Sequence, residues 1–293
     1  MPPELGAGRF RATVIGSPIG HSKSPRLHAA AYQALGIDCA YSALDVDEHR
    51  LPGFVDEVRR SPGWRGVSVT MPVKAAMARL VDDITDPARV LEVVNTVVVT
   101  GTGSDRVLTG HNTDVSGVAG ALVAAGVQRV EQATVLGGGA TAAAAIAALA
   151  RLGAAECSVL VRRPAAVAGE LHRLGGELGV EIGIVPWDEG VRSVRAADVL
   201  VSTLPPRGAD GLADRLRADA HFATTGRLLD VAYDPWPSAL ASLWQQRGGT
   251  MIPGLDMLIQ QAAEQVRLFF PEVRQDRAQV LDAMYDAVGA ARH

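Results

Sequence analysis

Short apolar runs alternate with helical stretches along most of this chain, and the alternation restricts the possible folds more than any other feature. RATVIG at residues 11–16 has the composition of a buried strand, and SPRLHAAAYQALG at 24–36 has helical spacing. YSALDV at 41–46 predicts another strand, and LPGFVDEVRR at 51–60 another helix. Strands and helices that alternate in this way usually build a sheet covered by helices. We therefore expect an α/β fold whose sheet is mainly parallel.

A second series of strand and helix signals starts near residue 114 and predicts a second domain. DVSGVAGALVAAG at 114–126 has helical character, and ATVL at 133–136 has that of a strand. A chain of 293 residues is long enough for two hydrophobic cores. We place the crossings near 112–115 and 248–254, with the C-terminal helical tail returning to the first domain. The predicted domains are residues 1–113 with 250–293, and residues 114–249.

Charge and composition argue against several classes of protein. The net charge of −4 and the pI of about 6.0 disfavour a broad surface for nucleic acid or an anionic membrane. Cys39 and Cys157 form no CxxC motif, and the seven histidines lack HExxH spacing, so we expect no metal and no disulfide framework. MPPELGAGRFR lacks the apolar stretch of a signal peptide, which favours the cytoplasm. Residues 132–150 are uncharged, but three successive glycines interrupt them, so we expect no membrane span.

A glycine-rich turn follows the strand at 133–136. VLGGGATAA fits G-x-G-x-x-A at Gly137, Gly139 and Ala142, between a strand and a helix. Glycines let the backbone approach a pyrophosphate closely, and the helix N-terminus presents free N–H groups and partial positive charge. In a chain rich in alanine and glycine, the same letters also fit a plain strand-to-helix turn. With its flanking elements, the motif predicts a Rossmann-type dinucleotide-binding domain.

The next predicted strand indicates which dinucleotide would bind. An NAD site places an acidic residue about 20 positions after the glycines, on the ribose hydroxyl. Here SVLV at 158–161 ends in Arg162 and Arg163 instead. Guanidinium groups bind phosphate in a bidentate manner, so the pair suits the 2′-phosphate of NADP, although both arginines could also lie on a solvated loop. We therefore favour NADP over NAD.

Polar side chains gather at four places in the first domain, each at a strand end, within a strand or in the following turn. Ligands of α/β sheets bind at the edge where strands end. Ser22 and Ser24 precede a helix and could hold a carboxylate, although a serine there can also simply cap the helix. The other groups are Ser68, Thr70 and Lys74 in SVTMPVK, Asn95 and Thr96 in VVNT, and Asn112 and Asp114 in GHNTD. Asn95 could also be a hydrogen-bonded amide in the core, and Asp114 could be the N-cap of the following helix.

These motifs together resemble the shikimate dehydrogenase family. GSPIGHSKSP, VSVTMPVK, VVNT, GHNTD, the glycine turn, DVAYDPW and GLDMLIQQA follow the family's order and approximate spacing over essentially the whole chain. The resemblance implies an enzyme of chorismate and aromatic amino acid biosynthesis that reduces 3-dehydroshikimate to shikimate with NADPH and without a metal. It implies a small-molecule substrate, no nucleic-acid or membrane partner, and a monomer or homodimer.

The resemblance also implies a role for individual residues of this chain. Lys74 and Asp114 would be the catalytic pair. The substrate-binding residues would be Ser22, Ser24, Thr70, Asn95, Tyr233 and Gln261. The cofactor-binding residues would be Gly137, Gly138, Gly139, Ala140, Arg162, Arg163, Val231 and Gly254, together with Asp86, at a position sometimes counted as a cofactor contact.

Lysine is rare in this chain, which sharpens the proposed role of Lys74. Of 28 basic residues, only Lys23 and Lys74 are lysines. A ring ketone needs a hydride on carbon and a proton on oxygen, and arginine does not release a proton at working pH. Asp114 would favour the charged ammonium, whereas burial would oppose it. The family accepts arginine at Lys23, so rarity alone does not identify a catalytic lysine.

Three departures from the family pattern concern selectivity. The family often has asparagine where this chain has Ser68, a different strand tip from Arg162-Arg163-Pro164, and a different residue at Asp256. Alternative functions are therefore a quinate/shikimate or aminoshikimate dehydrogenase paralogue. A non-catalytic dinucleotide sensor would not need Lys74 and Asp114. A methyltransferase would leave the first domain's serines, Lys74 and the NTD turn unexplained.

Overall fold

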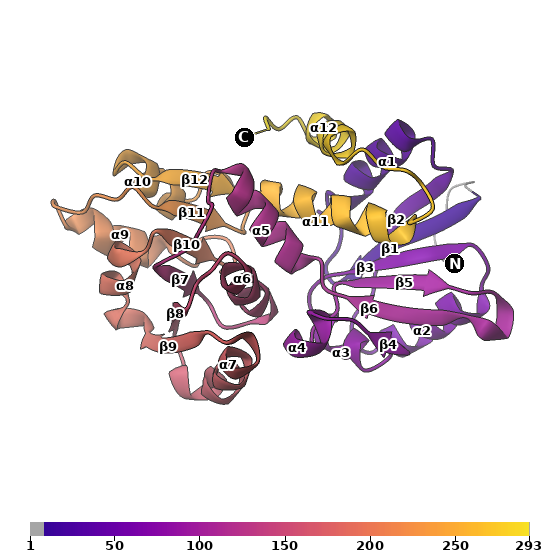
Figure 1. Ribbon diagram of the computed structural model, residues 1–293, viewed down its shortest axis with the longest axis horizontal. Helices are drawn as coiled ribbons and strands as arrows, with labels where there is room; N and C mark the ends of the chain where they lie inside the picture. The colour runs from indigo at the N-terminus through magenta and orange to yellow at the C-terminus, as the bar shows by residue number, and fades with distance from the viewer. Residues whose placement is uncertain (1–8, 293) are drawn as a thin grey trace. The chain divides into compact units, whose positions relative to one another are not determined.

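The computed structural model describes residues 9–292, and the chain divides into two compact units (Figure 1). The first unit contains the chain up to Thr113 and again from Ile259 onward, and the second is Asp114–Leu258. The return to the first unit lies later than the expected residue 250. Strand β12 (Thr250–Pro253) pairs with β11 (Arg227–Asp230), and these hydrogen bonds keep residue 250 and its neighbours in the second sheet.

The first unit is built on a six-stranded sheet with the strand order β2-β1-β3-β5-β6-β4. Strand β1 is parallel to β2 and β3, whereas β5 is antiparallel to both β3 and β6. The sheet is thus mainly parallel, as predicted, with β5 running against its neighbours. The bounds are β1 Phe10–Gly16, β2 Cys39–Asp45, β3 Trp64–Val69, β4 Asp83–Ile84, β5 Thr96–Thr100 and β6 Val107–His111.

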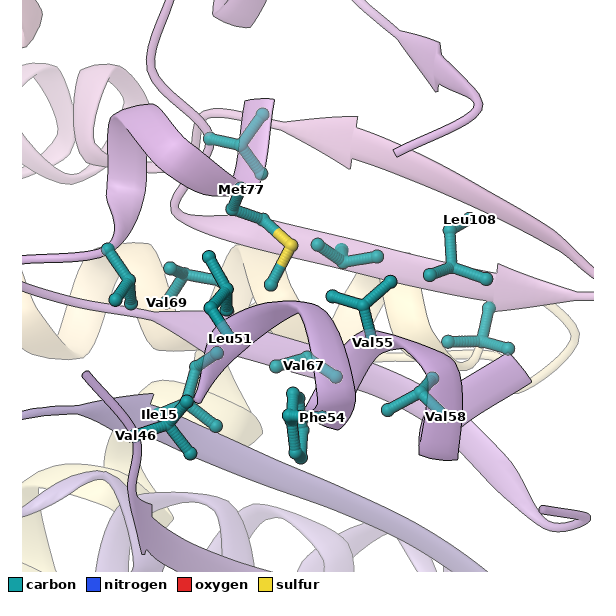
Figure 2. Packing of buried hydrophobic residues seen from close by; sticks show 14 of the residues in the cluster. Ile15, Val46, Leu51, Phe54, Val55, Val58, Val67, Val69, Met77 and Leu108 are labelled. Atoms are coloured by element: carbon teal, nitrogen blue, oxygen red, sulfur yellow. The ribbon is translucent and has the colours of Figure 1, made fainter. Parts of the chain in front are cut away.

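Helices cover the first sheet through apolar faces at helical spacing. Figure 2 shows Leu51, Phe54, Val55 and Val58 of α2 directed toward the buried side chains of the sheet, such as Val67. Helices α1 and α12 pack side by side (Figure 1). The helices that contribute to this unit are α1 Ser24–Leu35, α2 Leu51–Arg60, α3 Lys74–Ala78, α4 Ala88–Leu91, the 3₁₀ turn η1 Gly103–Asp105, α11 Gly254–Phe269 and α12 Arg277–Val288.

The second unit contains a wholly parallel six-stranded sheet with the order β12-β11-β10-β7-β8-β9. The chain enters at β7, moves outward through β8 and β9, and then returns to β10 on the other side of β7. This is the doubly wound order of a Rossmann-type domain, and the direction reverses between β7 and β10. The remaining strands are β7 Ala133–Leu136, β8 Glu156–Val161, β9 Glu181–Pro186 and β10 Val199–Ser202.

The helices of the second unit connect these parallel strands. Helix α6 and β7 together account for most of the uncharged run at 132–150. Within residues 9–292, no helix has both the length and the apolar character needed to cross a membrane. The bounds are α5 Asp114–Ala124, α6 Ala140–Arg151, α7 Pro164–Leu178, η2 Trp187–Glu189, α8 Val191–Ala196, α9 Asp210–Ala218 and α10 Ala239–Gln246.

An aromatic cluster surrounds a buried histidine in the first unit. The ring of His28 in α1 stacks on that of Tyr41 in β2, with centroids 3.9 Å apart and planes 12° apart. Tyr32 and Phe269 also lie against the imidazole. Nδ1 of His28 lies 2.9 Å from the carbonyl oxygen of Ser24, which can only accept, so Nδ1 carries the proton. Burial lowers the pKa of His28 to about 4, so the ring is neutral at pH 7.

Gly66 in β3 makes the closest approach in this core, and substitution there tests the packing. A Cβ at Gly66 would lie 2.0 Å from the Phe269 ring. We expect Gly66→Ala to destabilise the protein by about 1–3 kcal/mol, because the overpacked ring must shift. Gly53 in α2 has open space around its Cβ direction, so Gly53→Ala should be neutral or stabilising. Urea denaturation measures both, and an unchanged Gly66→Ala midpoint would contradict the packing.

His28 should make the stability depend on pH. Its pKa is lower in the folded chain than the ordinary value of 6.5, so the unfolded chain binds a proton first as the pH falls. The stability that depends on neutral His28 is complete above pH 6.5 and is lost as the pH falls toward 4. Between pH 7 and pH 5 we expect the free energy of unfolding to fall by about 2 kcal/mol more in the wild type than in His28→Phe. Urea denaturation at both pH values measures this, and equal losses would refute the assignment.

Candidate functional site

The predicted polar groups of the first unit converge at one edge of its sheet. The Thr70 N–H donates to Ile15 O at 2.8 Å, so the ends of β1 and β3 lie together. The apolar residues around Asn95 suggest that it lies inside a strand. In the structure it lies directly before β5, which begins at Thr96. Its carbonyl oxygen accepts from Val69 N at 2.7 Å, and its N–H donates to His111 O at 3.1 Å. Because β5 is antiparallel, its beginning meets the ends of β3 and β6.

The loops that follow β1 and β3 touch each other. The Ser17 N–H donates to Met71 O at 3.1 Å. A Cβ at Gly16 would lie 2.4 Å from Cγ2 of Thr70 and 2.7 Å from Met71 O. Glycine at position 16 therefore allows the approach that brings Thr70 beside the serine-containing loop.

The two serines lie at the beginning of α1. Ser24 is the first helical residue and is buried, whereas Ser22 lies in the preceding turn and is half-buried. The N-cap position belongs to Lys23, which makes no side-chain capping hydrogen bond. Oγ of Ser22 accepts from the Ser24 N–H at 3.3 Å, so Ser22 satisfies one free N–H of the helix start. Both hydroxyls lie where the helix end favours an anion.

Lys74 is held in place by its backbone. It is the first residue of α3 and is half-buried, and its carbonyl oxygen accepts from Val94 N at 3.2 Å. Val73 and Met77 anchor the short helix in the core. Pro72 directly precedes Val73, the N-cap of this helix. Since Val94 directly precedes Asn95, the backbone places Lys74 next to the site edge.

Asn95 is the centre of a buried hydrogen-bond network. Its Oδ1 accepts from the Thr113 N–H at 2.7 Å, and its Nδ2 donates to Thr113 Oγ1 at 3.0 Å. Oγ1 of Thr113 also lies 3.1 Å from Oε1 of Gln261 on α11. The structure thus brings Asn95 and Gln261 to the same hydroxyl. Asn95 is also the hydrogen-bonded core amide that the sequence allows, and Thr113, inside the NTD turn, was not predicted to join them.

Asp114 directly follows Thr113 and opens the second unit. It is buried and is the first residue of α5, where the partial positive charge of the helix start favours a carboxylate. Asp114 is therefore the first helical residue, N1, and not the N-cap residue that precedes the helix. The hydrogen bonds of Thr113 to Asn95 fix the chain immediately before Asp114 at the site edge of the first sheet.

The glycine turn in the second unit has the backbone that the motif predicts. Gly137 has a φ of 109°, and a Cβ there would lie 2.6 Å from Oγ1 of Thr203. Gly139 is the N-cap of α6 and Ala140 is its first residue, so free N–H groups face the turn. Gly138 lies at the carboxyl end of β7, where a Cβ would be 3.0 Å from Val161 of β8. Thr203, which directly follows β10, was missed, although a polar residue at the end of an apolar run is a usable signal.

Arg162 and Arg163 extend from the strand next to the glycine turn. They follow β8 directly, and the Gly137 N–H donates to Leu160 O at 2.9 Å, which joins the two strand ends. Both arginines are exposed. Pro164 is the first residue of α7, a position where its missing N–H is not needed. The departure at Pro164 is therefore compatible with the strand tip.

Val231 and Gly254 are brought together where β11 and β12 end. A Cβ at Gly254 would lie 2.2 Å from Val231 O, so only glycine fits. Tyr233 lies in the loop after β11 and is half-buried, and burial raises the pKa of its phenol. Asp256 is buried in the first turn of α11, where a carboxylate suits the helix end. These residues share the carboxyl edge with the glycine turn.

Asp86 is placed differently from the other predicted cofactor residues. It is exposed between β4 and α4 in the first unit, whereas the glycine turn belongs to the second. Neither unit by itself brings Asp86 to that turn. Among residues 9–292, no cluster of three or more His, Cys, Asp or Glu side chains could hold a metal ion.

Comparisons with known proteins show which family the chain resembles. Residues 14–97 match the model of the shikimate dehydrogenase substrate binding domain. The shikimate dehydrogenase (NADP(+)) of Sphingopyxis alaskensis is 35% identical, over 92% of this chain and 96% of that protein. That of Rubrobacter xylanophilus is 37% identical, over 87% of this chain and 88% of that protein.

Solved structures extend the similarity to the fold of the whole chain. The shikimate dehydrogenase of Mycobacterium tuberculosis is 40% identical with a TM-score of 0.82, and the match covers 94% of this chain and 99% of that one. The Thermus thermophilus enzyme, solved with NADP(H) and shikimate, is 31% identical with a TM-score of 0.77, covering 95% and 99%. This chain belongs to the shikimate dehydrogenase family.

Proposed function

We propose that this protein catalyses the reversible, NADPH-dependent reduction of 3-dehydroshikimate to shikimate. One observation carries the proposal: the antiparallel β5 brings Asn95 to the sheet edge where Thr70, Lys74 and the serine-containing loop meet. Membership of the shikimate dehydrogenase family supports the same reaction. Its expected cytoplasmic location and its monomeric or homodimeric state are part of the same proposal.

The substrate would be held by its carboxylate and its ring oxygens. Ser22 and Ser24 would bind the carboxylate with their hydroxyls at the start of α1, where a negative charge is favoured. Thr70, Asn95 and Gln261 would bind ring oxygens. Tyr233 would contribute its phenol from the second unit, where burial keeps it protonated and able to donate.

Lys74 and Asp114 would handle the proton. NADPH, when bound, supplies the hydride for the ring carbon. The ammonium of Lys74 would donate a proton to the carbonyl oxygen in reduction and take it back in oxidation. The carboxylate of Asp114 would stabilise the charged form of Lys74 and orient it.

The residues of the second unit would hold the cofactor. The pyrophosphate would lie on Gly137, Gly138, Gly139 and Ala140, whose backbone leaves space for it at the start of α6. The 2′-phosphate would bind Arg162 and Arg163 at the tip of the neighbouring strand. Val231 and Gly254 would border the cofactor. Asp86 is a cofactor candidate by family resemblance alone.

Ser68 supports a second candidate, a dehydrogenase that prefers quinate or an amino analogue. The hydroxyl of Ser68 lies in the hydrogen-bond network of the site and replaces the side-chain amide that the family often has there. A changed network next to Asn95 could shift the preference between ring substituents without removing Lys74 or Asp114.

A spectrophotometric assay tests the proposal. NADP⁺ reduction is followed at saturating shikimate, beside quinate and beside NAD⁺. We expect the highest kcat/KM with shikimate and NADP⁺. Faster turnover of quinate would establish the second candidate instead. Absence of any shikimate-dependent reduction would overturn the proposed reaction.

The two lysines give a matched pair of substitutions. We expect Lys74→Arg to lower kcat by about 10²–10⁴-fold, because guanidinium does not release a proton, with the KM for shikimate within a few-fold of wild type. Lys23→Arg should leave kcat unchanged. Asp114→Asn should also lower kcat. Steady-state kinetics measure all three, and a wild-type kcat in Lys74→Arg would exclude Lys74 as the proton donor.

The arginine pair should determine the choice of cofactor. We expect Arg162→Ala combined with Arg163→Ala to raise the KM for NADP⁺ by about 10–100-fold, because charge-assisted phosphate contacts are lost. The KM for NAD⁺, which lacks the phosphate, should change little. Arg151→Ala, an exposed arginine at the end of α6, serves as the control. Equal effects on NADP⁺ and NAD⁺ would show that the pair does not recognise the 2′-phosphate.

A further inference from the structure

We propose that Tyr41 is a positioning residue for Asn95, acting through other side chains rather than by touching the substrate. Four hydrogen bonds in series join the two residues, and they pass through Ser68, Gln265 and Thr96. The functional part of this inference rests on the proposed shikimate reaction. The structural part, that Tyr41 sets the orientation of the Asn95 amide, stands without it.

The first half of this hydrogen-bond chain, from Tyr41 to Gln265, crosses the sheet of the first unit. Oη of Tyr41 on β2 donates to Oγ of Ser68 on β3 at 2.7 Å. Oγ of Ser68 in turn donates to Oε1 of Gln265 on α11 at 2.8 Å. Strand β1 lies between β2 and β3, so the long phenol side chain spans the intervening strand.

The second half returns from α11 to the site edge. Nε2 of Gln265 donates to Oγ1 of Thr96 at 2.9 Å, and this hydroxyl donates to Oδ1 of Asn95 at 2.8 Å. Nε2 of Gln265 also lies 3.5 Å from the backbone oxygen of Asn95, which can only accept. That contact favours the amide orientation in which Nε2, not Oε1, faces Thr96.

The donors of this chain all point the same way. A hydroxyl has one proton, so Ser68 can donate to Gln265 only if it accepts from Tyr41. Ser68, Gln265, Thr96 and Asn95 are each at most 4% exposed. Water cannot readily replace a lost partner at such sites, so removing one end leaves a buried group unsatisfied or forces the chain to reorient.

Tyr41 is suited to be the fixed end of the chain. Its ring is stacked on the buried imidazole of His28, which restricts its rotation. Burial raises the pKa of its phenol well above the ordinary value, so the hydroxyl keeps its proton and remains a donor. The stacking on His28 fixes the position of the Tyr41 ring, and the protonated phenol makes Tyr41 the donor in the first hydrogen bond.

Asn95 is the functional end of the chain. Its Oδ1 accepts from Thr96 and from the Thr113 N–H, so the oxygen is engaged inside the network. Nδ2 donates one hydrogen bond to Oγ1 of Thr113 at 3.0 Å and carries a second N–H, so toward a ligand the amide acts as a donor. A donor matches the hydroxyl or carbonyl oxygens of the substrate ring. The chain from Tyr41 thereby supports the binding polarity of Asn95.

The hydrogen-bond chain explains physically why serine, and not the asparagine that the family often has, suits position 68. The serine hydroxyl accepts from Tyr41 and donates to Gln265 through one atom. An asparagine would accept and donate through two separate atoms on a longer side chain. Serine at position 68 is therefore the residue that links the phenol of Tyr41 to Gln265 in this protein.

Kinetics of hydroxyl-deletion variants test the functional part. Tyr41→Phe should raise the KM for shikimate by about 5-fold, as expected for one lost hydrogen bond, while kcat and the KM for NADP⁺ stay within about 2-fold. Tyr32→Phe removes a hydroxyl from the same aromatic cluster, outside the chain, and should have no effect. Ser68→Ala should resemble Tyr41→Phe, and the double variant should be no worse than Ser68→Ala. A wild-type KM in Tyr41→Phe, or effects that multiply in the double variant, would overturn the proposal.

NMR tests the structural part without requiring activity. The sequence has two asparagines, Asn95 and Asn112, so [¹⁵N]Asn labelling gives two side-chain amide pairs, and Asn95→Asp assigns them. Tyr41→Phe should shift the Asn95 pair. The Asn112 pair, which donates to Val93 O at 3.0 Å, should stay in place. Unchanged chemical shifts of the Asn95 amide pair in Tyr41→Phe would refute the role of the hydrogen-bond chain. If the wild type fails to oxidise shikimate but the Asn95 pair shifts, the proposed function fails and the positioning role of Tyr41 stands.

Discussion

The hydrogen bonds that β5 makes with the ends of its two neighbours determine where the chemistry of the first unit can lie. Val69 N donates to Asn95 O at 2.7 Å, and Asn95 N donates to His111 O at 3.1 Å. They form because β5 runs antiparallel to β3 and β6. In a wholly parallel sheet the beginning of β5 would lie at the opposite edge. The single reversed strand thus joins the VVNT segment to the loops that carry Ser22, Thr70 and Lys74.

The second unit reaches a comparable result without a reversed strand. All six strands are parallel, so every strand ends at the same edge. The change of direction between β7 and β10 leaves the glycine turn open to a ligand, with Thr203 on one side and the arginine pair on the other. Gly137 and Gly254 each allow a backbone approach that any Cβ would block. The two units therefore supply different parts of the proposed reaction from separate sheet edges.

Much of this arrangement could be predicted from the sequence because its signals are local. The alternation of strands and helices, the glycine turn and the helix at 24–36, which Gly36 caps in the structure, each depend on neighbouring residues. The position of Asn95 before an antiparallel strand was not predicted, because strand direction depends on partners far along the chain. The links from Tyr41 to Ser68 and from Ser68 to Gln265 were also not predictable, since they span 27 and 197 residues. The later return to the first unit depends on the pairing of β12 with β11, which is likewise non-local.

We propose that the edge of the first sheet binds the substrate through Ser22, Ser24 and Asn95. A crystal structure of the protein with shikimate tests it most directly. We expect the shikimate carboxylate to lie within hydrogen-bond distance of both serine hydroxyls, and a ring oxygen to accept from Nδ2 of Asn95. Shikimate bound at another surface, or bound here to Oδ1 of Asn95 rather than Nδ2, would contradict it.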